Sequence, residues 1–142
     1  MKIIVIGESC KDVFVYGDCN RLSPEAPVPV MIPKQIKDNF GMSGNVVKNL
    51  EVLDSNLEII HWHQEELITK TRYVDKKSNH MFLRVDEGEN SIGEFKLDEW
   101  KINEIKNADA VIFFEAGTSS IYSVKHILHC LIRGTPNTAI MY

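Results

Sequence analysis

The sequence has few cysteines, no long hydrophobic run and no excess of positive charge, and each shortage excludes a class of protein. Its cysteines, Cys10, Cys19 and Cys130, are odd in number and widely spaced, which fits neither a disulfide framework nor a zinc site, so we expect reduced thiols. The net charge of −4 offers no attraction to a polyanion, so nucleic acid is not an expected partner. The apolar run at residues 3–6 is too short for a signal peptide or a membrane span, so we expect a cytoplasmic protein.

The length and composition of the chain indicate one globular domain. The chain has 142 residues, of which 44% are hydrophobic and 25% charged, enough apolar material for one compact unit. Apolar runs predict buried strands at residues 2–7, 57–62, 110–115 and 137–141. Helical spacing of apolar residues separates them at residues 43–53, 97–107 and 121–131. This alternation predicts an α/β fold with a doubly wound sheet in three layers.

The helix at residues 43–53 has the clearest pattern. Ser43 is a favourable N-cap residue. Val46, Leu50 and Leu53 follow at spacings of four and three, which places them on one face. We expect that face to pack on the sheet.

Two segments interrupt the alternation. The first, Asp12 to Ile32, holds three prolines within six residues, while apolar residues recur at every second position. A proline has no backbone donor and cannot lie in the middle of a sheet, which predicts an edge strand or an exposed flap. The second, Leu67 to Val85, has two alternating runs around the turn-forming sequence KKSN. We expect the two segments to form a small antiparallel β flap beside the main sheet.

Several motifs together resemble the ribokinase or PfkB carbohydrate kinase family. They are VIGESCKDVFVYGD, NRLSPEAPVPV, GMSGNVVKNL, TKTRYV and FLRVD. Within the family, the resemblance is strongest to the heptose-7-phosphate kinases, and the proline spacing of SPEAPVPV is its most specific part. The resemblance covers nearly all of this chain but only the N-terminal half of such a kinase. It implies a ribokinase-like fold whose flap is a lid that closes over a sugar site and excludes water. The alternative is an edge strand that only prevents aggregation.

The resemblance also implies substrate-binding residues near the start of the chain. Asp12 matches a carboxylate that accepts hydrogen bonds from sugar hydroxyls, and the alternative is a solvated aspartate at a strand end. Gly41 and Asn45 match the ends of the family's GGxxN segment, in which glycine admits the ligand and the amide both donates and accepts. Met42 replaces the second glycine of that segment.

Three cations complete the predicted site. Lys70, Arg72 and Arg84 fall on the flap strands where, by the resemblance, a sugar phosphate would be gripped. The alternative is solvated charge along a sheet edge.

The sequence also departs from the family. It contains no GAGD segment, so we assign no catalytic residue and expect ATP and Mg²⁺ to be used by the complete kinase but not bound by this chain alone. The family's SDYxKG segment is here FEAGTS, with Glu115 for the acid and Thr118 for the lysine. Only HQEEL separates the second strand from the KTR strand, which predicts that one crossover is missing. The chain also stops directly after a strand, so we expect part of a longer protein or a half completed by association.

Histidines are the remaining candidates for chemistry. His61 and His63 alternate on a strand, and His126, His129 and Cys130 have helical spacing that suits a metal. No carboxylate or further cysteine completes either set, so core or surface histidine is the favoured interpretation and no metal site is predicted.

Three hypotheses about function remain. The first is the substrate-binding and lid half of a heptose-phosphate type sugar kinase, inactive without its second half. The second is a non-catalytic module for sugar-phosphate binding or dimerisation, and the third is a remnant without a ligand. The flap's alternating apolar residues also predict a homodimer, through Phe14, Tyr16, Val28, Val30, Tyr73 and Phe82.

Overall fold

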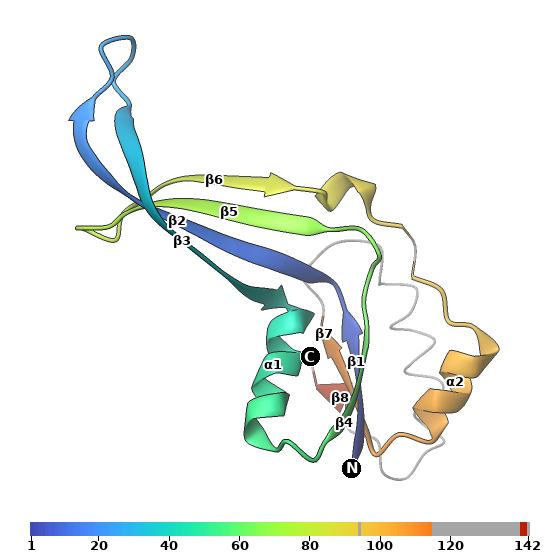
Figure 1. The fold of residues 1–142 in the computed structure, drawn as a ribbon. Coiled ribbons are helices and arrows are strands. Elements are labelled where there is room, and N and C mark those ends of the chain that lie inside the picture. Colours follow the sequence, from blue (N-terminus) through green and yellow to red (C-terminus); the bar gives the residue numbers. More distant parts are fainter. Residues whose placement is uncertain (94, 115–139, 142) are drawn as a thin grey trace.

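A parallel sheet forms the base of the protein (Figure 1). The computed structural model describes residues 1–93, 95–114 and 140–141. In the base sheet the strand order is β4-β1-β7-β8, and all neighbouring strands are parallel. The strands are β1 (Lys2–Gly7), β4 (Glu58–Trp62), β7 (Ala110–Phe114) and β8 (Ile140–Met141). The predicted helix at residues 121–131 lies outside the described residues.

Two helices cover opposite faces of this sheet, which gives the predicted three layers (Figure 1). Side chains alternate along β1 because successive residues of a strand point to opposite faces. Ile4 and Ile6 pack with Ile105 of α2 (Glu99–Lys106), and Ile3 and Val5 pack towards α1 (Ser43–Leu53). The prediction of a doubly wound α/β sheet is confirmed.

The prediction for α1 is correct in its bounds and wrong in two details. Val46 and Leu50 pack on the core, but Leu53 is 79% exposed. Leu57, just after the helix, packs on that cluster instead. Ser43 is not the N-cap, because the helix follows β3 without a loop and Met42 occupies the cap position with no side-chain cap hydrogen bond.

A second sheet of four strands forms the flap, with strand order β3-β2-β5-β6. The strands are β2 (Ser9–Leu22), β3 (Pro29–Met42), β5 (Ile68–Asp75) and β6 (Met81–Glu87). The flap is larger than predicted, since its first hairpin runs from Ser9 to Met42. It is also mixed, because the central pair, β2 and β5, is parallel. Sequence pattern missed the second half of β3 because its residues 32–40 are exposed and show no apolar alternation.

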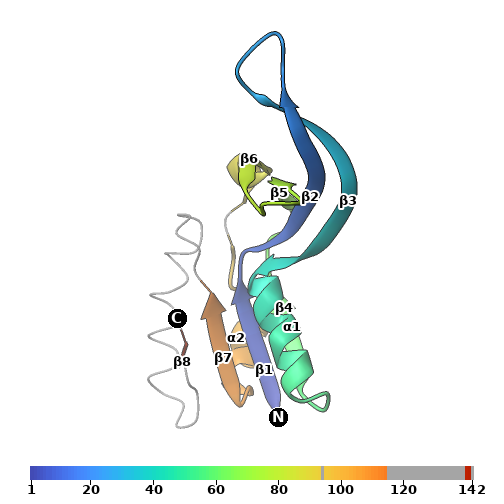
Figure 2. The ribbon, with the colours of Figure 1, turned by 90° about the vertical axis from the view of Figure 1, so that its left-hand side faces the viewer.

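The proline-rich segment lies where the sequence predicted. Pro24 and Pro27 are in the loop between β2 and β3, and Pro29 begins β3, which is an edge strand. Val28 and Val30 lie outside the base sheet. Figure 2 shows this hairpin curving away from the base sheet as a long ribbon. In the part of the chain that the structure describes, no helix is long and apolar enough to cross a membrane.

Candidate functional site

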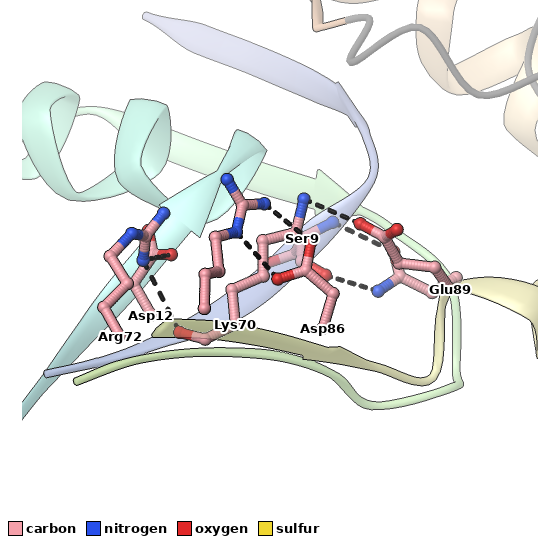
Figure 3. Close-up of polar contacts among 8 residues, drawn as sticks. Ser9, Asp12, Lys70, Arg72, Asp86 and Glu89 are labelled. Carbon is pink, nitrogen blue, oxygen red and sulfur yellow. Dashed lines mark hydrogen bonds and ion pairs between the residues drawn. The ribbon is translucent and has the colours of Figure 1, made fainter. Parts of the chain in front are cut away.

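Four of the six predicted site residues lie on one face of the flap. The strand register places Asp12 beside Lys70, and Lys70 beside Asp86 of β6. The next row of the same face contains Arg72, which lies beside Arg84. Figure 3 shows Asp12, Lys70, Arg72 and Asp86 on the same side of the strands. We name as the flap cluster Asp12, Lys70, Arg72, Arg84, Asp86 and Glu89.

Asp12 and Arg72 form the most enclosed ion pair of the flap cluster. The Arg72 guanidinium donates to Asp12 Oδ1 over 2.5 Å, and the two side chains are 21% and 20% exposed respectively. The guanidinium carbon of Arg72 also lies 5.0 Å from the centre of the Phe14 ring, a cation–π arrangement. Asp12 is therefore not a freely solvated aspartate, and its remaining oxygen can accept a hydroxyl hydrogen.

The other two cations of the flap cluster are also paired with carboxylates. Arg84 donates from Nε and from a terminal nitrogen to the two oxygens of Asp86, each over 2.7 Å. These hydrogen bonds raise the pKa of Arg84 and lower the pKa of Asp86. Lys70 Nζ lies 2.8 Å from Glu89 Oε1. The cluster thus holds three positive and three negative groups, and its formal charge cancels.

Gly41 borders the flap cluster from β3. It is buried, is the register partner of Cys10 in the neighbouring strand β2, and faces the Asp12 carboxylate. A Cβ atom at this position would collide with Asp12 and lie 2.5 Å from Cys10 Sγ. Burial and the neighbouring Asp12 raise the pKa of the Cys10 thiol above its usual value. A larger residue here would have to displace the Asp12 carboxylate and the Cys10 thiol, so glycine suits this position.

Asn45 is not brought into the flap cluster. It lies exposed in the first turn of α1, and no described contact joins it to Asp12 or to the three cations. Its helix is nevertheless held in a fixed place. The Ser43 backbone N–H donates to the Glu8 carbonyl over 2.9 Å, and the Ser43 hydroxyl donates to the Gly7 carbonyl over 2.8 Å.

His61 continues this buried network. A serine hydroxyl has one hydrogen, and that of Ser43 goes to Gly7, so His61 Nε2 donates to Ser43 Oγ over their 2.8 Å separation. Burial first, and then the neighbouring His63, lowers the pKa of His61 to about 4. His61 is thus a partly buried histidine that is held in place by Ser43. No group of three metal ligands occurs among the described residues, and His126, His129 and Cys130 lie outside them.

Sequence reasoning missed four residues that shape this region. Gln64 joins the start of β2 to the loop before β5, because its side chain accepts from the Ser9 N–H over 2.9 Å and donates to the Glu66 carbonyl over 3.1 Å. Ser43 was assigned only a capping role. Asp86 could have been found, since residues 84 and 86 share a face of a strand. Glu89 had no signal, because a turn brings it to Lys70.

Two hollows lie near the carboxyl ends of β1 and β4. One, of about 580 Å³, is bordered by α1, the base of the flap and His61. The other, of about 320 Å³, is lined by Gly7, Glu8, Gln64 and Lys101 among others. Ligands of open α/β sheets bind at this edge. The four cofacial residues predicted from sequence line neither hollow; they lie on the flap instead.

Comparison with known proteins gives sequence matches to parts of longer proteins and a match in fold over nearly all of this chain. No family model matches. The chain is 42% identical over 60 residues to Bifunctional protein HldE of Campylobacter fetus, covering 42% of this chain and 13% of that protein. The match to the HldE of Actinobacillus succinogenes is 24% identical and covers 89% of this chain and 32% of that protein. The chain thus spans a third or less of these curated relatives.

Solved structures decide the fold. A carbohydrate kinase from Agrobacterium tumefaciens superposes with a TM-score of 0.60 at 11% identity, over 99% of this chain and 53% of the kinase. The chain has a ribokinase-like fold. The ribokinase from Giardia lamblia agrees, with a TM-score of 0.56 at 10% identity, over 98% of this chain and 53% of that enzyme. The predicted resemblance to carbohydrate kinases is confirmed.

One departure from the kinase pattern has a measurable geometry in this ribokinase-like chain. Met42, at the position of the family's second glycine, has φ 57° and ψ −134°. A residue with a Cβ atom rarely adopts a positive φ, whereas glycine does so freely. The backbone has therefore kept the conformation that suits glycine, at a cost of order 1–3 kcal/mol. The FEAGTS segment, with Glu115 and Thr118, continues from Phe114 outside the described residues.

Proposed function

We propose that this chain is the substrate-binding and lid half of a sugar-phosphate kinase of the heptose-7-phosphate type. The single observation that carries the proposal is the gathering of Asp12, Lys70, Arg72 and Arg84 on one flap face, next to a glycine that lies against the Asp12 carboxylate. The likeness to HldE proteins and the kinase fold support it. The heptose itself rests on the sequence resemblance.

The chemistry of the flap cluster suits a phosphorylated sugar. A carboxylate is a strong acceptor for sugar hydroxyls, and guanidinium and ammonium groups donate to phosphate oxygens. Asp12 is the hydroxyl acceptor in this proposal, and the three cations hold the phosphate. Asn45, exposed on α1, contacts the sugar only if the sugar extends from the flap to that helix.

Phosphoryl transfer from ATP belongs in this proposal to the complete kinase. ATP and Mg²⁺ would be held by a second half, supplied by another segment or chain. The sequence contains no GAGD segment. Half of the positioning groups should give no rate above background, because this reaction depends on positioning and charge stabilisation.

We further propose a homodimer formed through the flaps. The predicted apolar residues do not share one face: Phe14 and Tyr16 lie on the face of the flap cluster, and Tyr73 lies on the opposite face. On that opposite face one register row is apolar across all four strands, with Ile36, Val15, Tyr73 and Leu83 side by side. Ile36 and Leu83 are 65% and 54% exposed, so this row is the surface that would join two copies.

The function is tested by calorimetric titration of the chain with D-glycero-D-manno-heptose 7-phosphate. The proposal expects saturable binding by the wild type and a clear loss of affinity in Asp12→Asn. Glu87→Gln is the matched control, because Glu87 lies on the opposite face of the flap, beside Thr69.

A further inference from the structure

The ion pairing of the flap cluster conflicts with its proposed task. Each of the three cations already has a carboxylate partner, so a phosphate would have to share these cations with an anion that is already in place. An incoming phosphate dianion would also meet three negative groups at short range, and like charges repel strongly where solvent is limited. Phosphate should therefore bind more tightly when one carboxylate leaves its partner.

Lys70 is the cation best placed to change partners. Its side chain is 14% exposed, the least of the three, so its ammonium group is poorly served by water and needs an anion. It also lies between Asp12 and Asp86 in the strand register, at the centre of the flap cluster. An ammonium group has three rotatable donors and no fixed fork, so it can exchange one anion for another without changing its place.

Glu89 is the carboxylate best able to leave. Asp12 and Asp86 belong to strands β2 and β6 and accept from planar guanidinium groups, Asp86 from two nitrogens of Arg84. Glu89 instead belongs to the 3₁₀ turn η1 (Glu89–Ser91), and its carboxylate contacts a single ammonium group. It also has one more rotatable side-chain bond than an aspartate. It can turn away from Lys70 without disturbing a strand.

The backbone of this turn is nonetheless held in place. Gly88 has φ 86°, and a Cβ atom there would collide with the Leu67 carbonyl oxygen, so the turn lies directly against the start of β5. The Gly93 N–H donates to Glu66 Oε1 over 3.1 Å. Both ends of the turn lie against residues just before β5, so the turn keeps the Glu89 side chain within reach of Lys70. The Glu89 carboxylate can therefore return to Lys70 when a bound phosphate leaves.

We propose that the Glu89 carboxylate is an internal anion that occupies, on Lys70, the position taken by the phosphate of the substrate. Glu89 is thus a specificity-determining residue: a phosphorylated sugar replaces its charge, whereas an uncharged sugar leaves Lys70 paired with Glu89. This inference rests on the proposed function for the sugar, but the exchange of anions on Lys70 can be measured without a sugar.

Titration of the full chain with inorganic phosphate, the heptose 7-phosphate and the unphosphorylated heptose tests this inference. Glu89→Gln removes the competing charge and keeps the side-chain shape, so it should bind both phosphate-bearing probes about fivefold to tenfold more tightly than the wild type. Its affinity for the unphosphorylated heptose should be unchanged. The control Glu87→Gln removes an equal charge on the opposite face and should bind all three probes as the wild type does.

The possible results distinguish a failure of the proposed anion exchange on Lys70 from a failure of the proposed kinase function. If Glu89→Gln binds phosphate no more tightly than the wild type, the inference is wrong, even if the wild type binds the heptose 7-phosphate. If Glu89→Gln gains affinity for phosphate but neither protein binds the sugar phosphate any better than phosphate itself, the anion exchange stands and the sugar kinase assignment fails.

Nuclear magnetic resonance of the wild type covers the case in which Glu89→Gln does not fold. The carboxyl carbon of Glu89 should shift on addition of phosphate, while that of Glu87 stays unchanged. A Glu89 signal that does not respond to phosphate would overturn the inference.

Discussion

Asp12 and Arg72 are 60 positions apart in the sequence, and their side chains meet in a 2.5 Å ion pair on the flap. The pair is made possible by the parallel register of β2 and β5, which sets Asp12 beside Lys70 and therefore diagonal to Arg72. It joins the first hairpin of the flap to the second, and it fixes the orientation of the carboxylate proposed to bind the sugar.

A double-mutant cycle on this pair measures its strength. Asp12→Asn and Arg72→Met should each lower the free energy of unfolding by about 1–2 kcal/mol, because a partly buried charged hydrogen bond is lost. The double variant should lose clearly less than the sum, since the second change removes a group that has already lost its partner. Chemical denaturation of the four proteins gives these values, and strict additivity would show that the pair does not couple the hairpins.

Met42→Gly should stabilise the protein. The backbone at Met42 has φ 57°, which glycine adopts without steric cost, so we expect a gain of about 1 kcal/mol in the free energy of unfolding. Met81→Gly is the matched control: Met81 lies in strand β6 and is not among the described residues with positive φ, so this change should destabilise. Thermal denaturation compares them, and equal losses in both variants would contradict the account of strain at Met42.

His61 should make stability depend on pH. Its pKa is about 4 in the folded chain and near 6.5 when unfolded, so between these values the unfolded chain binds a proton that the folded chain does not. Stability should therefore fall as the pH is lowered from 6.5 towards 4. Replacing His61 with glutamine, which cannot take up that proton, should flatten the dependence over this range. Denaturation at several pH values provides the test, and parallel curves for the two proteins would exclude His61 as the cause.

The proposed homodimer predicts a different response at two exposed apolar residues. Ile36→Lys places a charge in the apolar row of Ile36, Val15, Tyr73 and Leu83, and should convert the dimer to a monomer. Val28→Lys changes the loop between β2 and β3, where Val28 is half-exposed, and should weaken the dimer only if the loops also meet. Sedimentation of the wild type and both variants decides this. A monomeric wild type, or a dimer indifferent to Ile36→Lys, would rule out association through this face.

The sequence predicted the base sheet well because its strands are continuous apolar runs, such as Ile3 to Ile6, whose burial on both faces permits no other structure. It predicted the edge position of the proline segment for an equally strict reason, since a proline cannot donate to a neighbouring strand. The full length of β3 was not visible, because exposed polar residues such as Lys37 and Asp38 form strands only through their neighbours.

The candidate site was predictable in part. The resemblance named Asp12, Lys70, Arg72 and Arg84, and alternation along a strand places Lys70 and Arg72 on one face. No sequence pattern could place Glu89 against Lys70, because the contact depends on the turn at Gly88. The sequence could not show the ion pairs for the same reason. It therefore predicted three cations available to a phosphate, although each cation already has a carboxylate partner.

One measurement tests the central claim most directly: calorimetric titration of the 142-residue chain with the heptose 7-phosphate, followed by an assay for phosphate transfer from ATP on the same sample. The account predicts saturable binding that Asp12→Asn weakens about tenfold or more, as expected for loss of one charged hydrogen bond, together with no transfer above background. Glu87→Gln should bind as the wild type does. Absence of binding by the wild type, equal binding by Asp12→Asn, or turnover by the chain alone would contradict the assignment of this chain as the substrate-binding half of a kinase.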